Sequence, residues 1–181
     1  MTIEAGKAFL LQVDVQQRLL PVMHDAARVV SACATLIKAA EALDLPIVQT
    51  EQYPKGLGPT VPELETKNAM IFDKLAFSVW RDDALRLHLR RMRESGFSQV
   101  IVSGIEAHIC VLQSALDLRA AEFEVYVVAD AVASRAADSA NLALSRMRRH
   151  GVDVVNVEMA MFELAGKAGT PEFKALSALI K

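Results

Sequence analysis

The arrangement of apolar and polar residues divides the chain into short apolar runs that alternate with longer amphipathic segments. Near-continuous runs of Val, Ile, Leu and Phe are typical of strands that are covered on both faces of a parallel sheet. Such runs predict strands at 8–15, 45–51, 69–74, 98–105, 124–131 and 152–158. Segments with a helical pattern lie at 24–43, 80–95, 110–122 and 136–150. This alternation predicts an α/β fold with a mostly parallel sheet and right-handed crossovers.

The segment 51–64, "EQYPKGLGPTVPEL", departs from this alternation. It holds three of the six prolines and two of the eight glycines, which predicts a long ordered loop in place of a crossover helix. Ligands of open parallel sheets bind outside the carboxyl ends of the strands. Because the loop directly follows the second predicted strand, we expect it to form a wall of any site at that edge.

Because ligands bind at the carboxyl ends of parallel strands, polar residues at these ends are expected to lie close together. Those at or just after predicted carboxyl ends are Asp14, Glu51, Lys74, Glu106, His108 and Cys110. A thiol reacts as its thiolate, which a helix start and a nearby cation both favour. Cys110 stands at a predicted helix start, and Lys74 would supply positive charge. Asp14 is then placed to transfer the proton, so these residue types suit nucleophilic catalysis.

Three short segments resemble a known family. Asp14 in "LLQVDVQ", Lys74 in "FDKLAFS" and Cys110 in "SGIEAHIC" occur in the order of the Asp-Lys-Cys triad of isochorismatase-like cysteine hydrolases, which include nicotinamidases and carbamoylsarcosine-amidase-type enzymes. "TEQYPKGLGPTVPEL" and "GIEAHIC" are similar to the subgroup of isochorismatase-domain-containing proteins. The resemblance covers essentially the whole chain. It implies a single domain over 1–181 with a three-layer α/β/α fold and a six-stranded, mostly parallel sheet.

The resemblance also implies roles for these residues. Cys110 is the expected nucleophile, Asp14 the general acid and base, and Lys74 the group that orients Asp14 and stabilises the thiolate. A cis peptide bond is expected between Ile105 and Glu106, with an oxyanion hole made by the backbone N–H groups of Glu106 and Cys110. The implied reaction is hydrolysis of a small amide or related carbonyl compound through a thioester on Cys110.

One feature of the family is missing. Nicotinamidases hold a divalent metal with an Asp and two His after the second strand, whereas "TEQYPKGLG" contains no histidine. No two of the histidines in the chain form a ligand spacing. We therefore expect neither a catalytic metal nor another cofactor, and the substrate stays open.

Side chains that flank the triad segments are candidates for a substrate pocket. Gln16, Tyr53, Phe77 and Trp80 would line it, and the alternative is that they pack beneath the loop. His108 is expected at the pocket or at an interface, because Asp14 and Lys74 already supply the proton chemistry. Cys33 lies within an apolar helical pattern, which predicts an inert thiol in the core.

Composition narrows the class of partner. The 20 basic residues are offset by 22 acidic ones, so the net charge of −2 gives no electrostatic footprint for nucleic acid. Two cysteines are too few for a disulfide framework. No targeting pattern is evident, and no apolar run approaches the roughly 18 residues of a membrane span. We therefore expect a cytoplasmic protein that acts on a small molecule and binds neither nucleic acid nor membranes. The mean hydropathy of +0.25 favours a homo-oligomer.

Two functions of other classes stay open. A catalytically weak binding or scaffold protein could keep this fold and act through partners. A redox role for Cys110 is the other, although Cys33 lies on a different predicted helix and is no evident resolving cysteine. Nucleotide binding is disfavoured, because "GLGP" matches neither the G-x-G-x-x-G fingerprint nor a Walker loop.

Overall fold

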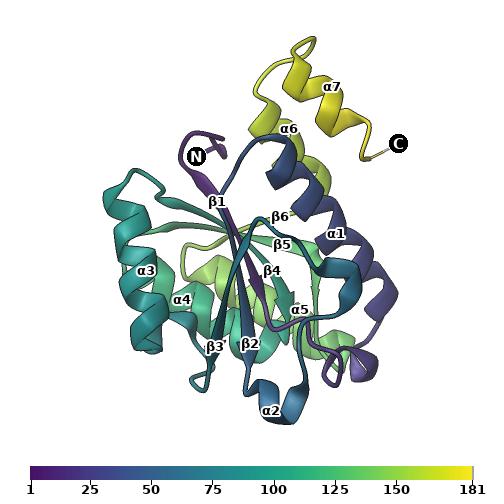
Figure 1. Ribbon diagram of the computed structural model, residues 1–181, viewed down its shortest axis with the longest axis vertical. Coiled ribbons are helices and arrows are strands. Elements are labelled where there is room, and N and C mark those ends of the chain that lie inside the picture. Colours follow the sequence, from purple (N-terminus) through teal and green to yellow (C-terminus); the bar gives the residue numbers. More distant parts are fainter. Residues whose placement is uncertain (181) are drawn as a thin grey trace.

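The computed structural model describes residues 1–180, which form a six-stranded sheet between two layers of helices (Figure 1). The sheet has the strand order β3-β2-β1-β4-β5-β6, and every neighbouring pair is parallel. The strands are β1 Ala8–Val13, β2 Ile47–Gln52, β3 Ala69–Lys74, β4 Gln99–Ile105, β5 Glu124–Ala133 and β6 Asp153–Val155. The order reverses direction between β1 and β4. This is the switch point at which open α/β sheets place their ligand crevice.

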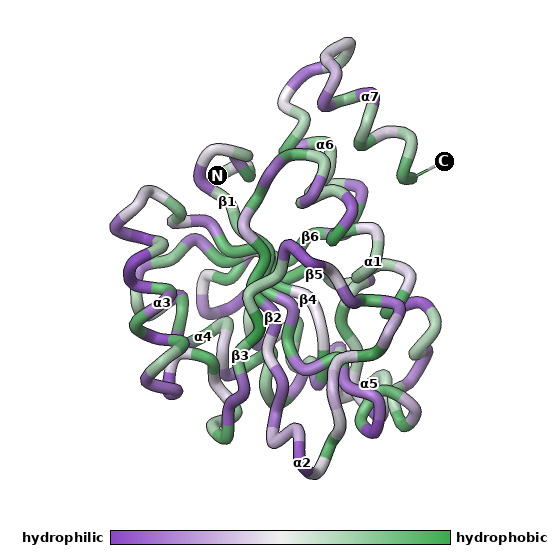
Figure 2. The backbone as a smooth tube through the Cα atoms, viewed as in Figure 1, coloured by the Kyte–Doolittle hydropathy of each residue, from purple (hydrophilic) through white to green (hydrophobic). Residues whose placement is uncertain are grey.

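Helices cover both faces of the sheet and enclose two apolar cores. The helices α1 Ala26–Ala42, α6 Val157–Ala165 and α7 Pro171–Ser177 belong to one face; α3 Asp83–Glu94, α4 Leu112–Ala120 and α5 Ala137–Arg149 belong to the other. Successive side chains of a strand point to opposite faces, so Leu10 enters the first core while Phe9 and Leu11 enter the second. Figure 2 shows the resulting concentration of hydrophobic residues along the central strands. None of the helices in residues 1–180 has the length and apolar character that crossing a bilayer requires.

The predicted α/β/α architecture and six-stranded parallel sheet are confirmed, and β3 has the predicted bounds. The segment 51–64 also lacks a crossover helix, as expected. After β2 ends at Gln52 it contains only the short helix α2 Pro54–Leu57 and a 3-10 turn at Pro62–Leu64. This connection runs from the carboxyl end of β2 to the start of β3, so α2 lies beside the strand ends.

Several predicted boundaries were wrong. The predicted strand 152–158 ends at Val155, because Asn156 caps α6 and its Oδ1 accepts a hydrogen bond from the backbone N–H of Met159 at 2.7 Å. The helices α6 and α7 were not predicted. The predicted helix 80–95 is a 3-10 turn followed by α3, whose N-cap is Asp82. The predicted helix start at 110 is a π-helical turn, Ala107–Val111, and α4 begins only at Leu112.

Gly104 allows the two central strands to approach at the switch point. It pairs with Val13 of β1, and its φ of 116° lies in the region that L side chains rarely adopt. A Cβ atom at this position would lie 2.1 Å from the carbonyl oxygen of Val13 and 2.6 Å from its nitrogen. The strand ends that carry Asp14 and the segment leading to Cys110 therefore require glycine here.

Replacing Gly104 with alanine is expected to lower the free energy of unfolding by about 3 kcal/mol or more, because the new methyl group overlaps the backbone of Val13. Urea unfolding followed by circular dichroism measures this change. Gly6→Ala is the matched control, since a Cβ atom there meets no atom within 4 Å. A Gly104→Ala protein as stable as the wild type would contradict the close approach.

Candidate active site

Asp14 follows β1 at the switch point and is completely buried. Its backbone has a φ of 53°, and its N–H donates to the carbonyl of Thr50 at 3.0 Å. The carboxylate accepts two side-chain hydrogen bonds. Oδ1 accepts from the Thr50 hydroxyl at 2.6 Å, and Oδ2 accepts from Nζ of Lys74 at 2.7 Å. Burial raises the pKa of Asp14, while the Lys74 ammonium and these hydrogen bonds oppose that rise.

Lys74 ends the edge strand β3, yet its side chain is fully buried. Besides Asp14, its Nζ donates to Oε1 of Gln52 at 2.7 Å, and its third N–H is shared between the carbonyl oxygens of Ala76 and Phe77, each at 3.2 Å. A buried ammonium is costly unless it is paired and hydrogen-bonded. Here one carboxylate balances the charge and neutral oxygens surround it.

Cys110 lies in the π-helical turn after β4 and is 5% exposed. Its sulfur lies close enough to the Asp14 carboxylate and to the backbone N–H of Glu106 for both groups to shift the pKa of the thiol. The structure therefore brings Asp14, Lys74 and Cys110 together from β1, β3 and the turn after β4.

The protonation state of Cys110 differs from the expectation of a stabilised thiolate. Burial raises its pKa to about 12, and the negative charge of Asp14 adds to the rise. Lys74 opposes the rise, but it is paired with Asp14 at the same time. The helix proper also begins two residues later than the sequence suggested. A thiol with this raised pKa is protonated at neutral pH.

The turn that holds Cys110 begins with a cis peptide bond between Ile105 and Glu106, at the position that the family resemblance implies. The carbonyl of Glu106 accepts from the backbone N–H groups of Ile109 at 3.0 Å and Val111 at 3.2 Å. Its carboxylate pairs with Nε of Arg135 at 2.9 Å. The conformation of this turn is thus held from both the backbone and the side chain of Glu106.

His108 does not form a pair with Cys110 in the described part of the chain. Its Nδ1 lies 2.8 Å from the hydroxyl of Ser134, and its backbone N–H donates to the same oxygen at 3.3 Å. Ser134 is fully buried beside the end of β5. These contacts fix His108 at the rim of the turn, where it is half-buried.

The four predicted pocket residues beside the triad segments have different surroundings. Gln16 is buried beneath the loop 53–61, where its amide bonds to backbone groups, which is the alternative role considered for it. Tyr53 and Phe77 are each 52% exposed at the carboxyl edge. The expected place of Trp80 in the substrate pocket was wrong. It packs edge-on against Phe123, with ring centroids 5.8 Å apart, toward the amino ends of the strands.

The sequence pattern singled out Glu51 and did not predict its two neighbours in the site, Thr50 and Gln52. Side chains alternate along β2, so Glu51 points to the opposite face, where its Oε1 accepts from the backbone N–H and the hydroxyl of Thr60 at 2.6 and 2.8 Å. Thr50 and Gln52 share the face of Asp14 and Lys74. The signal that could have found them is this alternation.

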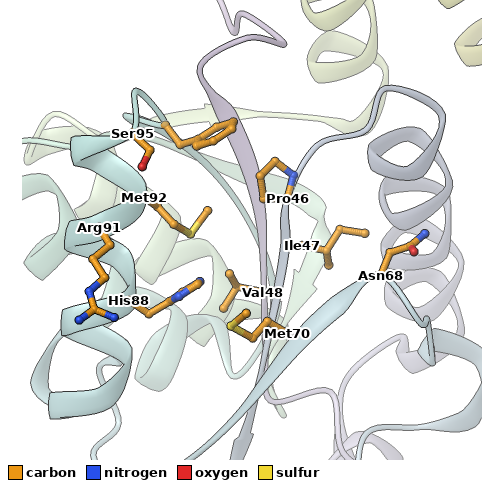
Figure 3. Close-up of a pocket in the computed structure, with 10 residues that line it drawn as sticks. Pro46, Ile47, Val48, Asn68, Met70, His88, Arg91, Met92 and Ser95 are labelled. Carbon is orange, nitrogen blue, oxygen red and sulfur yellow. The ribbon is translucent and has the colours of Figure 1, made fainter.

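Within residues 1–180 no metal-binding cluster lies at this edge, and the groove beside the 51–64 segment is lined by Glu51, Pro59 and Thr60 and not by the triad. No group of three His, Cys, Asp or Glu side chains there could hold a metal ion. A groove of about 360 Å³ lies elsewhere, between the amino-terminal half of β2, β3 and α3. Figure 3 shows His88 from α3 pointing across it toward Val48 and Met70.

The strand order 3-2-1-4-5-6, with a thiol and a buried Asp–Lys pair at the switch point, defines an isochorismatase-like α/β protein. The Isochorismatase domain family model matches residues 8–159, and the chain belongs to this family. This confirms the resemblance seen in the sequence.

The relatives include two curated proteins of similar length. Isochorismatase domain-containing protein 2 from Homo sapiens is 37% identical over 176 residues, covering 97% of this chain and 84% of that protein. The secreted isochorismatase effector Isc1 from Phytophthora sojae is 37% identical over 177 residues, covering 95% and 83%.

Two solved structures have closely similar folds. The MAR1 ribonuclease from Caenorhabditis elegans has a TM-score of 0.91 at 34% identity, covering 99% of this chain and 92% of that chain. The YcaC gene product from Escherichia coli, an octameric hydrolase of unknown specificity, has a TM-score of 0.91 at 24% identity, covering 99% and 89%. The second likeness supports the fold alone.

Replacing Thr50 with valine is expected to raise the pKa of Asp14 by on the order of one unit, because it removes a hydrogen bond that favours the carboxylate. Titration of the Asp14 carboxyl carbon by NMR measures this pKa. Thr35→Val is the control, since its hydroxyl bonds to Ser31 within α1. An unchanged pKa in Thr50→Val would show that this hydrogen bond does not set the charge of Asp14.

Proposed function

We propose that this protein is an isochorismatase-family cysteine hydrolase that acts, without a metal, on a small amide or related carbonyl compound. The observation that carries the proposal is the position of Asp14. Its carboxylate accepts from the Lys74 ammonium at 2.7 Å and also lies close enough to the thiol of Cys110 to shift its pKa. A buried carboxylate between a cation and a thiol is placed to take and return a proton.

In the first half of the reaction, the sulfur of Cys110 attacks the substrate carbonyl while its proton moves to Asp14. The electron pair of the carbonyl bond moves to oxygen, and the backbone N–H groups of Glu106 and Cys110 would donate to that oxyanion. The tetrahedral intermediate then collapses. The C–N bond breaks, and the leaving amine takes the proton from Asp14, which leaves a thioester on Cys110.

In the second half, water attacks the thioester while Asp14 accepts its proton. The C–S bond breaks, the acid product leaves, and the proton returns from Asp14 to the sulfur of Cys110. Each cycle consumes one water, and the enzyme regains its resting protonation state. The raised pKa of Cys110 suits this sequence, because the thiol gives up its proton only as the carbonyl is attacked.

Lys74 would keep Asp14 available as a base. Burial alone favours the neutral acid, which could not accept a proton. The ammonium stabilises the carboxylate, and because it donates to several oxygens at once it holds a fixed position as the proton moves. Lys74 thus acts on charge and orientation and takes no part in covalent chemistry.

The name of the C. elegans relative suggests a nucleic-acid substrate for that protein. A net charge of −2 does not favour a polyanion here, so we propose a small molecule. We further propose a homo-oligomer, because the YcaC relative is octameric and the β3 edge exposes the apolar side chains of Met70, Ile71 and Leu75.

Ammonia release from a panel of small amides tests the nucleophile. Cys110→Ala is expected to lower kcat/KM by about 10³-fold or more, because it removes the attacking atom. Cys33→Ala is the matched control, since Cys33 is a buried thiol in α1. If Cys110→Ala keeps full hydrolysis, the proposed mechanism is wrong. If the wild type hydrolyses no amide in the panel, the binding or scaffold function is favoured.

The pH dependence of the same assay tests the base. Asp14 must be ionised to accept a proton, so kcat/KM is expected to fall as pH falls through its pKa, which burial raises above 3.8. Ionisation of Cys110 is not expected to limit activity near neutral pH, because burial raises the pKa of its thiol to about 12. Thr50→Val should move the acid limb of the pH profile to higher pH, since it removes a hydrogen bond that stabilises the Asp14 carboxylate and so raises the pKa of Asp14. An acid limb that does not move would exclude Asp14 as its source.

A further inference from the structure

The side chain of Gln52 connects Lys74 to the loop that follows it. Gln52 is the last residue of β2, and its Oε1 accepts from Nζ of Lys74 at 2.7 Å. Its Nε2 donates to the carbonyl of Leu75 at 2.8 Å. An ammonium only donates and a carbonyl only accepts, so these two contacts allow one orientation of the amide.

Gln16 fixes the backbone of Gln52 in turn. Its Oε1 accepts from the N–H of Gln52 at 2.8 Å, and its Nε2 donates to the carbonyl of Gln52 at 3.0 Å and to that of Gly58 at 2.6 Å. Gln16 is completely buried. Because Gln16 lies two residues after Asp14, the contacts close a ring that runs from Asp14 through Gln16, Gln52 and Lys74 back to Asp14.

This ring holds Lys74 from the interior of the fold, whereas the other groups that bind its ammonium belong to an exposed loop. Two of its four acceptors are the carbonyls of Ala76 and Phe77, at 3.2 Å each. Their loop carries Leu75 at 74% exposure and Phe77 at 52% exposure. The two acceptors at 2.7 Å are Asp14 and Gln52, and of these only Gln52 is also tied to that loop.

We propose that Gln52 is a positioning residue that holds the ammonium of Lys74 against Asp14, with Gln16 as its anchor in the fold. It acts through Lys74 and touches neither the thiol nor the reacting atoms. The catalytic consequence rests on the proposed function, because the position of Lys74 matters for hydrolysis only if Asp14 is the base.

A neutral amide suits this position better than a carboxylate. A second anion beside Lys74 would share its charge and weaken the hold on the Asp14 carboxylate. The neighbouring Glu51 points to the other face of the sheet, where Thr60 binds its carboxylate. The site therefore contains one anion for one cation.

The charged groups that face this pair come from few elements. Asp14 follows β1, Lys74 ends β3, and the ionisable thiol of Cys110 lies in the turn after β4. In that same turn the carboxylate of Glu106 is paired with Arg135, and His108 bonds to Ser134. Lys74 is the charged group with the largest effect on the pKa of Asp14, so a shift in a variant that leaves the burial of Asp14 and its bond to Thr50 unchanged reports on Lys74.

The test is NMR titration of the Asp14 carboxyl carbon in Gln52→Met and Gln52→Glu, with iodoacetamide alkylation of Cys110 at pH 8 as the second readout. Gln52→Met is expected to raise the pKa of Asp14 by about one unit and slow alkylation about tenfold, because Lys74 is no longer held in place. Gln52→Glu should raise the pKa further, since it adds a competing anion. Gln17→Met, which removes an exposed glutamine of the adjoining segment, should change neither.

The outcomes separate positioning from structural support. A Gln52→Met protein with a lower melting temperature but an unchanged Asp14 pKa would overturn the proposal. If Gln52→Met does not fold, Gln52→Glu decides, because it keeps the oxygen that faces Lys74. Lys74→Met should raise the pKa most. If Lys74→Met raises the pKa of Asp14 and the Gln52 variants do not, the positioning role of Gln52 is wrong while the role of Lys74 stands. If the shifts occur but the wild type hydrolyses no amide, positioning stands and the proposed hydrolase function fails.

Discussion

The buried ion pair between Asp14 and Lys74 constrains the rest of the carboxyl edge. Neither side chain of the pair is exposed, so each charge loses its hydration on folding. Such a pair is tolerable only when the remaining lone pairs and N–H groups also find partners. Thr50 and Gln52 of β2 supply two of them, and the backbone after β3 supplies others. Three adjacent strands must therefore end in register for the pair to exist.

The sheet topology places the thiol beside this pair. The order of the strands reverses between β1 and β4, so the chain after β1 and the chain after β4 leave the sheet side by side. Gly104 lets the backbones approach at that point. The turn after β4 then returns Cys110 over Asp14 before α4 begins. The proximity of a thiol and a carboxylate 96 residues apart thus follows from the strand order.

The sequence was sufficient for features that depend on chain pattern. Apolar runs located the strands, and the carboxyl-end rule grouped Asp14, Lys74 and Cys110 at one edge. Features that depend on tertiary contacts could not be predicted from the sequence. Trp80 flanks a triad segment in sequence, yet it packs on Phe123 near the other end of the sheet. The helix α6 was missed because its sequence begins with Asn156 and Val157, which continue the pattern of a strand. The protonation of Cys110 depends on how deeply the turn is buried.

The two thiols of the chain show why a raised pKa does not by itself distinguish an inert cysteine from a reactive one. Burial raises the pKa of both Cys33 and Cys110 to about 12. Cys33 faces the carbonyl of Ala131, with Sγ and oxygen 3.5 Å apart, and a carbonyl cannot take its proton. Cys110 lies beside the carboxylate of Asp14, whose charged form the Lys74 ammonium favours against the effect of burial. In the proposed mechanism the reactivity of Cys110 therefore depends on the base beside the thiol, and the groups around Asp14 would keep that base charged in an apolar interior.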